Sequence, residues 1–155
     1  MSLKFSSLYG GLLNSTNSNS NTNMDLELDN YAESEIELNY LIQLLLQFRT
    51  HIKMFHWQTT QFSFHKISDE LLSSIDELTD KFVETGLGLL NIRPNIMNNS
   101  LTLRNVSLNI LLDEINKVEN ILRQSTKLML KSEIGTIRDE ILIVIAKAKY
   151  LMTFK

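Results

Sequence analysis

The 155-residue chain lacks cysteine, and it has only one proline and five glycines. Without cysteine there is no disulfide, no thiolate metal site and no cysteine nucleophile, and the composition fits a reducing compartment. So few prolines and glycines predict long helices rather than a turn-rich β fold. The longest apolar run, residues 141–146, is too short to cross a bilayer, so no membrane attachment is expected.

The chain also lacks a cluster of basic residues. Lys and Arg are scattered singly, and the net charge is −3. Binding to nucleic acid through neutralised phosphates is therefore not expected. Hydrophobic residues make up 43% of the chain, which is enough for one packed domain. We expect a soluble protein of the cytoplasm.

The chain divides into a polar tail and a helical domain. Residues 1–30 contain the low-complexity run NSTNSNSNTN and are expected to be disordered, because such a segment buries too little surface to offset its ordering entropy. In residues 31–155, apolar side chains recur at three- and four-residue spacing, which is typical of amphipathic helices. The expected helices cover residues 34–57, 64–85, 107–131 and 136–153.

Local signals set the expected ends of these helices. Ser34 suits an N-terminal cap and Ser107 is expected to start the third helix. Gly86 and Gly88 are expected to end the second helix, and residues 136–139 resemble a capping box for the fourth. The connection after the second helix is long enough to cross a helix hairpin. The pattern predicts an all-α fold, a ferritin-like four-helix bundle with one long crossover between the second and third helices.

One edge of the second helix is rich in potential metal ligands. Its members fall within an arc of about 100° beside the apolar stripe: His65, Asp69, Asp76, Asp80 and Glu84. The acids have no basic partner on this arc, so they repel one another unless a cation or a second subunit relieves them. Iron, manganese or zinc suits such a mixture of oxygen and imidazole ligands.

Helix geometry places these ligands in two groups. His56 ends the first helix next to His65, whereas Glu84 lies on the order of 30 Å further along the second helix. An isologous two-fold dimer, with second helices antiparallel near Ser74, would bring the groups together. Each of two equivalent sites would then combine three residues of one chain with two of the other: His56, His65 and Asp69 with Asp80 and Glu84. An intrachain ferritin centre would need Glu-x-x-His motifs on two helices, and no histidine follows His65.

These residues resemble the ferroxidase segment of the Dps-type mini-ferritins. The resemblance lies in His56-Trp57, then His65-x-x-x-Asp69, then Asp80-x-x-x-Glu84, and it extends more weakly over residues 34–154. The His-Trp-Gln-Thr opening and the closing Tyr-Leu-Met-Thr are more similar still to an uncharacterised ferritin-like branch of large DNA viruses and phages.

The resemblance implies a function and a set of ligands. It implies oxidation of Fe(II) by peroxide or oxygen, storage of ferric mineral in a hollow homo-oligomer, often a dodecamer, and protection against oxidative stress. His56, His65, Asp69, Asp80 and Glu84 match the family's metal ligands, and Trp57 matches the tryptophan beside that centre. His56 and His65 are closer together in this chain than in typical members. The lysine-rich tail with which some members bind DNA is absent, so DNA binding through a tail is not expected.

Other interpretations of these residues stay open. The chain could be a structural or virion-associated helical oligomer with a weak or absent metal site, located in the host cytoplasm or the virion, or a dimeric manganese or zinc protein without mineral storage. His51 lies about 140° around the helix from His56 and is interpreted as structural. Trp57 is interpreted as a core residue rather than an electron-transfer group, and Asp76 as a supporting residue or the partner of a surface base.

Overall fold

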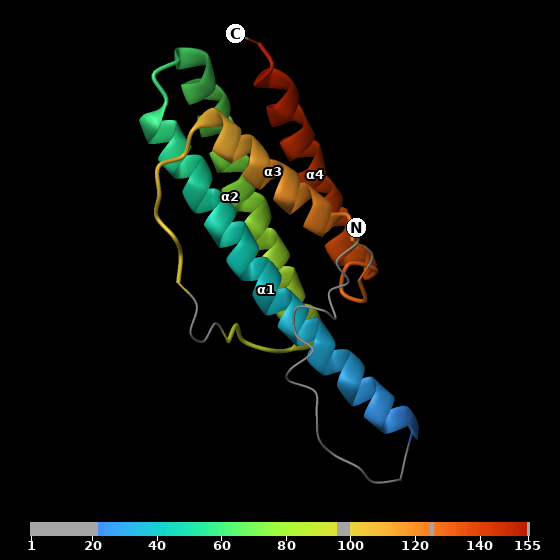
Figure 1. Ribbon diagram of the computed structural model, residues 1–155. Helices are drawn as coiled ribbons and strands as arrows, with labels where there is room; N and C mark the ends of the chain where they lie inside the picture. The colour runs from blue at the N-terminus through green and yellow to red at the C-terminus, as the bar shows by residue number, and fades with distance from the viewer. Residues whose placement is uncertain (1–21, 96–99, 125, 155) are drawn as a thin grey trace.

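The computed structural model describes residues 22–95, 100–124 and 126–154. These residues form four α-helices and no strand (Figure 1): α1 Thr22–Gln58, α2 Phe62–Leu90, α3 Leu108–Leu122 and α4 Ser132–Leu151. The predicted all-α four-helix bundle is confirmed. No described helix is long and apolar enough to cross a membrane.

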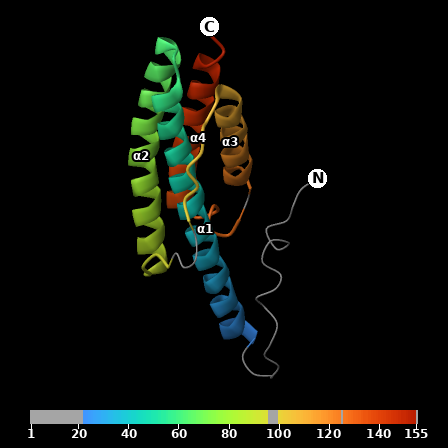
Figure 2. The same ribbon diagram turned by 60° about the vertical axis from the view of Figure 1, so that its left-hand side comes forward.

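The four helices pack in a ring of neighbours. Among the described residues, α1 packs against α2 and α3, and α4 packs against α2 and α3, so α2 and α3 lie diagonally opposite. Helix α1 is the longest, and its N-terminal end extends beyond the other three helices in both views (Figures 1 and 2). The turn between α1 and α2 lies at the same end of the bundle as the end of α4 (Figure 1).

The described parts of the connection between α2 and α3, residues 92–95 and 100–107, are bound to α1. Side chains of α1 accept three of its backbone N–H groups: Asn95 N–H binds Asn39 Oδ1 at 3.2 Å, Thr102 N–H binds Gln47 Oε1 at 2.7 Å and Val106 N–H binds Gln58 Oε1 at 2.7 Å. The chain thus follows α1 towards its C-terminal end. We call residues 100–107 the strap.

The core lies between the apolar faces of the four helices. On α2 the expected stripe is buried at Leu71, Leu72, Ile75 and Phe82, and half-buried at Leu78. Full burial of each such side chain contributes about 1.5–3 kcal/mol before the entropy of ordering is subtracted. Helical periodicity therefore identified the buried face of α2.

Helix α1 begins at Thr22, earlier than the expected start at Ser34. Ser34 is buried inside the helix, and its hydroxyl donates to the carbonyl oxygen of Asn30 at 2.9 Å instead of capping. Residues 22–30 of the expected disordered tail are therefore helical, and residues 1–21 lie outside the described part of the chain.

Helix α2 continues through both glycines that were expected to end it. It stops at Asn91, which has a left-handed φ of 48° and donates to the Gly88 carbonyl, while Ile92 N–H reaches the Leu87 carbonyl. A Cβ at Gly86 would lie 2.7 Å from Leu38 Cδ1, so this glycine allows α1 and α2 to approach closely.

The ends of α3 and α4 follow burial rather than local signals. The expected start at Ser107 is confirmed, and Ser107 is the N-cap of α3, accepting from Ile110 N–H, but the helix ends at Leu122 and not near residue 131. The chain then turns so that Leu128 is buried in the core. Helix α4 begins before the expected capping box, and the Thr136 hydroxyl donates to the Ser132 carbonyl inside its first turn.

Candidate metal centre

The short turn between α1 and α2 brings two histidines together. His56 is in the last turn of α1 and His65 in the first turn of α2, and their rings stack with centroids 3.9 Å apart and an interplanar angle of 25°. Beneath them, Phe55 and Phe64 pack with ring centroids 6.3 Å apart. The apolar pair anchors the two helix ends, and the adjacent histidines are thereby held in contact.

Each histidine ring is bound to the backbone of the other. His56 Nδ1 lies 3.2 Å from the carbonyl oxygen of His65, and His65 Nδ1 lies 3.0 Å from the carbonyl oxygen of His56. A carbonyl oxygen only accepts hydrogen bonds, so both Nδ1 atoms carry the proton. In the neutral rings both Nε2 atoms therefore keep a lone pair, and neither forms a hydrogen bond within the described residues. Metal-binding histidines are commonly oriented in this way.

Ser68 and Asp69 complete this end of α2. Ser68 is fully buried; its hydroxyl donates to the His65 carbonyl at 3.0 Å and lies 3.3 Å from His56 Nδ1, from which it accepts. Asp69 is largely exposed, and its Oδ1 lies 4.0 Å from His56 Nε2. The structure thus gathers His56, His65 and Asp69 at one place. Sequence reasoning missed Ser68, for which the spacing offered no signal.

The two remaining candidate ligands lie on the far half of α2. Asp80 and Glu84 are exposed, and neither has a hydrogen bond or ion pair to any described residue. The neighbouring Lys81 is used elsewhere, since its Nζ lies 2.8 Å from Glu140 Oε2 on α4. Asp80 is eleven residues from Asp69, or roughly 16 Å along the helix. Among the described residues, no basic side chain therefore pairs with these two carboxylates, which lie one helical turn apart.

Asp76 has a partner within its own chain. Arg49 on α1 donates from Nε and Nη2 to the two oxygens of this carboxylate, the second at 3.2 Å. The hydrogen bond to Asp76 raises the pKa of the Arg49 guanidinium above its usual range. The interpretation of Asp76 as the partner of a surface base agrees with this contact, although the base lies within the chain.

No complete centre forms within one chain. Among the described residues, no group of three or more His, Asp or Glu side chains is arranged so that it could hold a metal ion. His56, His65 and Asp69 are neighbours, but Asp80 and Glu84 are too distant to join them. A centre that used all five residues would have to be shared between copies of the chain.

Two exposed aromatic side chains flank the histidine pair. Trp57 is 66% exposed, with Lys53 Nζ 5.3 Å from its ring centroid, and Phe62 is 78% exposed. The interpretation of Trp57 as a core residue is therefore wrong, because Phe55 and His56 turn inward at this end of α1 and Trp57 turns outward. Phe62 was not singled out in the sequence.

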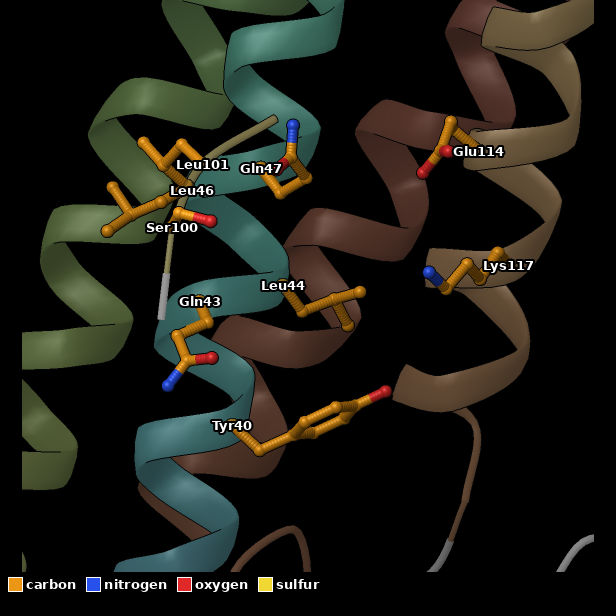
Figure 3. A pocket seen from close by; sticks show the side chains of 9 residues that line it. All are labelled: Tyr40, Gln43, Leu44, Leu46, Gln47, Ser100, Leu101, Glu114 and Lys117. Atoms are coloured by element: carbon orange, nitrogen blue, oxygen red, sulfur yellow. The ribbon is translucent and has the colours of Figure 1, made fainter. Parts of the chain in front are cut away.

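His51 belongs to a separate, buried network. Its Nε2 lies 2.9 Å from Gln47 Nε2, and its Nδ1 lies 3.6 Å from Glu114 Oε1 on α3. Gln47 and Glu114 also line a cavity of about 230 Å³ between α1, the strap and α3 (Figure 3). This cavity is lined by neither His56 nor His65. The structural interpretation of His51 fits its burial.

The fold and these side chains define a class: a four-helix bundle that presents a histidine and aspartate group at the α1–α2 turn. Residues 56–152 match a family of unknown function (DUF5856), and the chain belongs to that family. The matched region begins at His56 and contains all five candidate ligands. No curated protein and no solved structure matches the chain.

Proposed function

We propose that this protein binds and oxidises Fe(II) at a site shared by two copies of the chain. Each site combines His56, His65 and Asp69 of one copy with Asp80 and Glu84 of the other. The observation that carries the proposal is the pair of reciprocal ring-to-carbonyl hydrogen bonds, which keeps both Nε2 lone pairs available beside the Asp69 carboxylate. The resemblance to the Dps-type mini-ferritins supports the same assignment.

The charge pattern of α2 supports a shared site. Asp80 and Glu84 have no hydrogen bond or ion pair to any part of the chain that the structure describes, and a cation held with the imidazoles of a second copy would relieve their repulsion. The midpoint between His65 and Glu84 lies near Ser74, on a two-fold axis that would relate two antiparallel α2 helices. One axis then forms two equivalent sites.

The proposed reaction follows from this donor set. Iron is the substrate: carboxylate oxygens stabilise the more highly charged ferric product, and imidazole is a good ligand for Fe(II). Each Fe(II) gives up one electron, and a pair of electrons with two protons reduces one hydrogen peroxide to two water molecules. We further propose that a closed oligomer stores the ferric product. Because the reaction consumes both Fe(II) and peroxide, it would protect against oxidative stress.

Anaerobic titration with Fe(II), followed by addition of hydrogen peroxide, tests the proposal. We expect the double variant Asp80→Ala/Glu84→Ala to bind Fe(II) at least about tenfold more weakly and to oxidise it correspondingly slowly. Glu77→Ala is the matched control, since Glu77 is an exposed acid on the same helix without a partner among the described residues. Unchanged binding and oxidation in the double variant would contradict the proposal.

A second candidate function is a structural or virion-associated oligomer. It is favoured by Trp57 and Phe62, two exposed aromatic side chains near the α1–α2 turn, which suit a protein contact. Elemental analysis of protein purified without added metal separates the two candidates. Bound iron with peroxide-dependent turnover supports the ferroxidase, and an oligomer without metal or turnover supports the structural role.

A further inference from the structure

Two of the contacts that hold the strap to the bundle lead to His51. Gln47 on α1 binds both backbone groups of Thr102, since it accepts from the Thr102 N–H at 2.7 Å and donates to the Thr102 carbonyl at 2.9 Å. Arg104, two residues further along, has its guanidinium 2.5 Å from Glu114 Oε1 on α3. His51 lies between these two attachments, with Nε2 2.9 Å from Gln47 Nε2 and Nδ1 3.6 Å from Glu114 Oε1.

The two hydrogen bonds to Thr102 fix the orientation of the Gln47 amide. Its oxygen faces the Thr102 N–H and its nitrogen faces the Thr102 carbonyl, because the reverse orientation would set donor against donor and acceptor against acceptor. The same amide nitrogen presents its second hydrogen to His51 Nε2. His51 Nε2 therefore accepts a hydrogen bond and carries no proton, so the ring is neutral with its proton on Nδ1.

The Nδ1–H of His51 has no hydrogen-bond acceptor among the described residues. His51 is only 3% exposed, and the Glu114 carboxylate at 3.6 Å is too distant for a good hydrogen bond. Within the described chain, neither α2 nor α4 supplies a hydrogen bond or ion pair to His51. The charged groups around the ring are thus Glu114 and Arg104, with Lys117 on the same cavity wall. A buried N–H without an acceptor destabilises the neutral ring, whereas Glu114 would attract a positively charged ring.

A proton on His51 Nε2 reverses the hydrogen-bonding role of this atom. The new N–H is a donor, and it meets an N–H donor of Gln47. The Gln47 amide removes this conflict by turning over, so that its oxygen accepts from the imidazolium, but both of its hydrogen bonds to Thr102 are then lost. The imidazolium also competes with Arg104 for the Glu114 carboxylate. One proton thus weakens the strap at both attachments.

The strap forms one wall of the cavity between α1 and α3. Its residues Ser100 and Leu101 line this cavity of about 230 Å³ (Figure 3). Thr102 follows them directly in the chain. Release of Thr102 from Gln47 therefore frees this wall of the cavity as well.

We infer that His51 is a pH-sensitive switch for the strap: uptake of one proton at Nε2 releases Thr102 from α1 and opens the cavity. Histidine suits this task because it is the side chain that ordinarily changes charge between pH 5 and pH 8. The proton comes from solvent and stays on the ring, so only hydrogen bonds change. The switch does not rest on the proposed metal site, since neither His56 nor His65 lines the cavity or is hydrogen-bonded to His51.

Hydrogen–deuterium exchange of the full-length protein, resolved to single residues, tests this inference. Each amide is compared with the same amide of an unstructured chain at the same pH, so that the intrinsic pH dependence of exchange cancels. We expect the protection of the Thr102 amide to fall at least about tenfold between pH 8 and pH 5. The Val106 amide is the internal control, because it is bound to Gln58 in the same strap, and its protection should stay within about twofold.

Two variants separate the switch from a merely structural role of His51. In His51→Gln the new side chain can still accept from Gln47, but it gains no proton in this pH range. We therefore expect its Thr102 amide to be equally protected at pH 8 and pH 5. Gln47→Ala should reduce the protection of Thr102 to the same low value at both pH values. Far-UV circular dichroism checks that both variants remain helical.

Nitrogen NMR of the natural chain provides a measurement that needs no substitution. We expect His51 Nε2 to carry no proton at pH 8 and to gain one over the same pH interval in which Thr102 loses protection. A proton on Nε2 at pH 8 would overturn the inference, because the hydrogen bond from Gln47 excludes it.

The exchange results support or overturn the switch without reference to iron. A loss of protection at Thr102 alone, absent in His51→Gln, supports it. Unchanged protection at Thr102, equal losses at Thr102 and Val106, or a loss that persists in His51→Gln overturns it. None of these measurements depends on Fe(II) binding or oxidation, so the switch and the proposed function can fail separately.

Discussion

The two ends of α2 differ in how far one chain organises them. At the N-terminal end, His56, His65 and Ser68 are tied together by hydrogen bonds of 3.0–3.3 Å, with Asp69 beside them. At the C-terminal half, Asp80 and Glu84 are exposed and have no hydrogen bond or ion pair to a described residue. Imidazole has a direction and must be oriented, whereas a carboxylate on a helix surface supplies charge in many rotamers. The N-terminal end of α2 therefore holds side chains in a fixed orientation, whereas its C-terminal half presents negative charge without a fixed orientation.

Removing an imidazole should give the largest effect. We expect His56→Ala and His65→Ala each to weaken Fe(II) binding by roughly 100-fold, because each removes a ligand and the ring that stacks against the other histidine. Absorption titrations with cobalt(II) in place of Fe(II) measure the affinity of the site for a divalent metal. Lys66→Ala, on the same turn of α2, is the control. If the histidine variants bind as tightly as the Lys66 variant, the N-terminal end is not the organised half of a metal site.

Adding a methyl group at the C-terminal end of α2 should act on stability. A Cβ at residue 86 would lie 2.7 Å from Leu38 Cδ1 and 3.1 Å from Cδ2, so Gly86→Ala should lower the free energy of unfolding by about 1–3 kcal/mol. A Cβ at Gly88 would have no atom within 4 Å, so Gly88→Ala should raise the free energy of unfolding by about 0.4–1 kcal/mol. Urea denaturation measures the free energy of unfolding of both variants. Equal changes in Gly86→Ala and Gly88→Ala would show that the close approach of α1 does not require glycine at residue 86.

Loss of the Ser68 hydroxyl should weaken the site without removing a ligand. Ser68→Ala leaves His56 Nδ1–H with only the His65 carbonyl as acceptor, so we expect Fe(II) affinity to fall about tenfold. Ser68→Thr keeps the hydroxyl and should restore most of the affinity. An Ala variant that binds Fe(II) as tightly as the natural protein would mean that the His65 carbonyl alone orients His56.

The smallest effect concerns pH and compares two glutamates. Burial raises the pKa of the Glu37 carboxyl above its usual range, although the Thr126 hydroxyl that donates to it lowers this pKa. A raised pKa gives stability that is complete below the unfolded-state pKa and is lost as the pH rises through the folded-state value. Glu37→Gln should therefore match the natural chain in acid and become relatively more stable towards neutral pH.

For Glu119 the stability should depend on pH in the opposite direction. Hydrogen bonds from Lys149 and then Arg123 lower the pKa of this carboxyl, so its contribution is present above the unfolded-state pKa and is lost as the pH falls through the folded-state value. Glu119→Gln should be less stable than the natural chain near neutral pH and equal to it in acid. Urea unfolding across this pH range measures both variants, and parallel rather than opposite trends would contradict the assignment.

The buried faces of the helices could be predicted because they depend on local periodicity. The stripe of Leu71, Ile75 and Phe82 follows from 3.6 residues per turn, and the Ser107 cap follows from the hydroxyl one residue before α3. The helix ends near Gly86 and residue 131 could not be predicted, because contact with Leu38 and burial of Leu128 override the local signals. Those contacts join residues far apart in the chain.

The sequence by itself determined the four helices, the candidate ligands and their separation into two groups along α2, since residue spacing on a helix translates directly into distance. Only the tertiary structure decided how His56 and His65 meet, that Ser68 supports them, that Trp57 faces outward and that Gln47 and Gln58 bind the strap. These features depend on the turn that ends α1 and on side chains of α1 that bind the connection. A hydrogen bond between residues distant in sequence leaves no periodic signal, so it becomes visible only when the helices are packed.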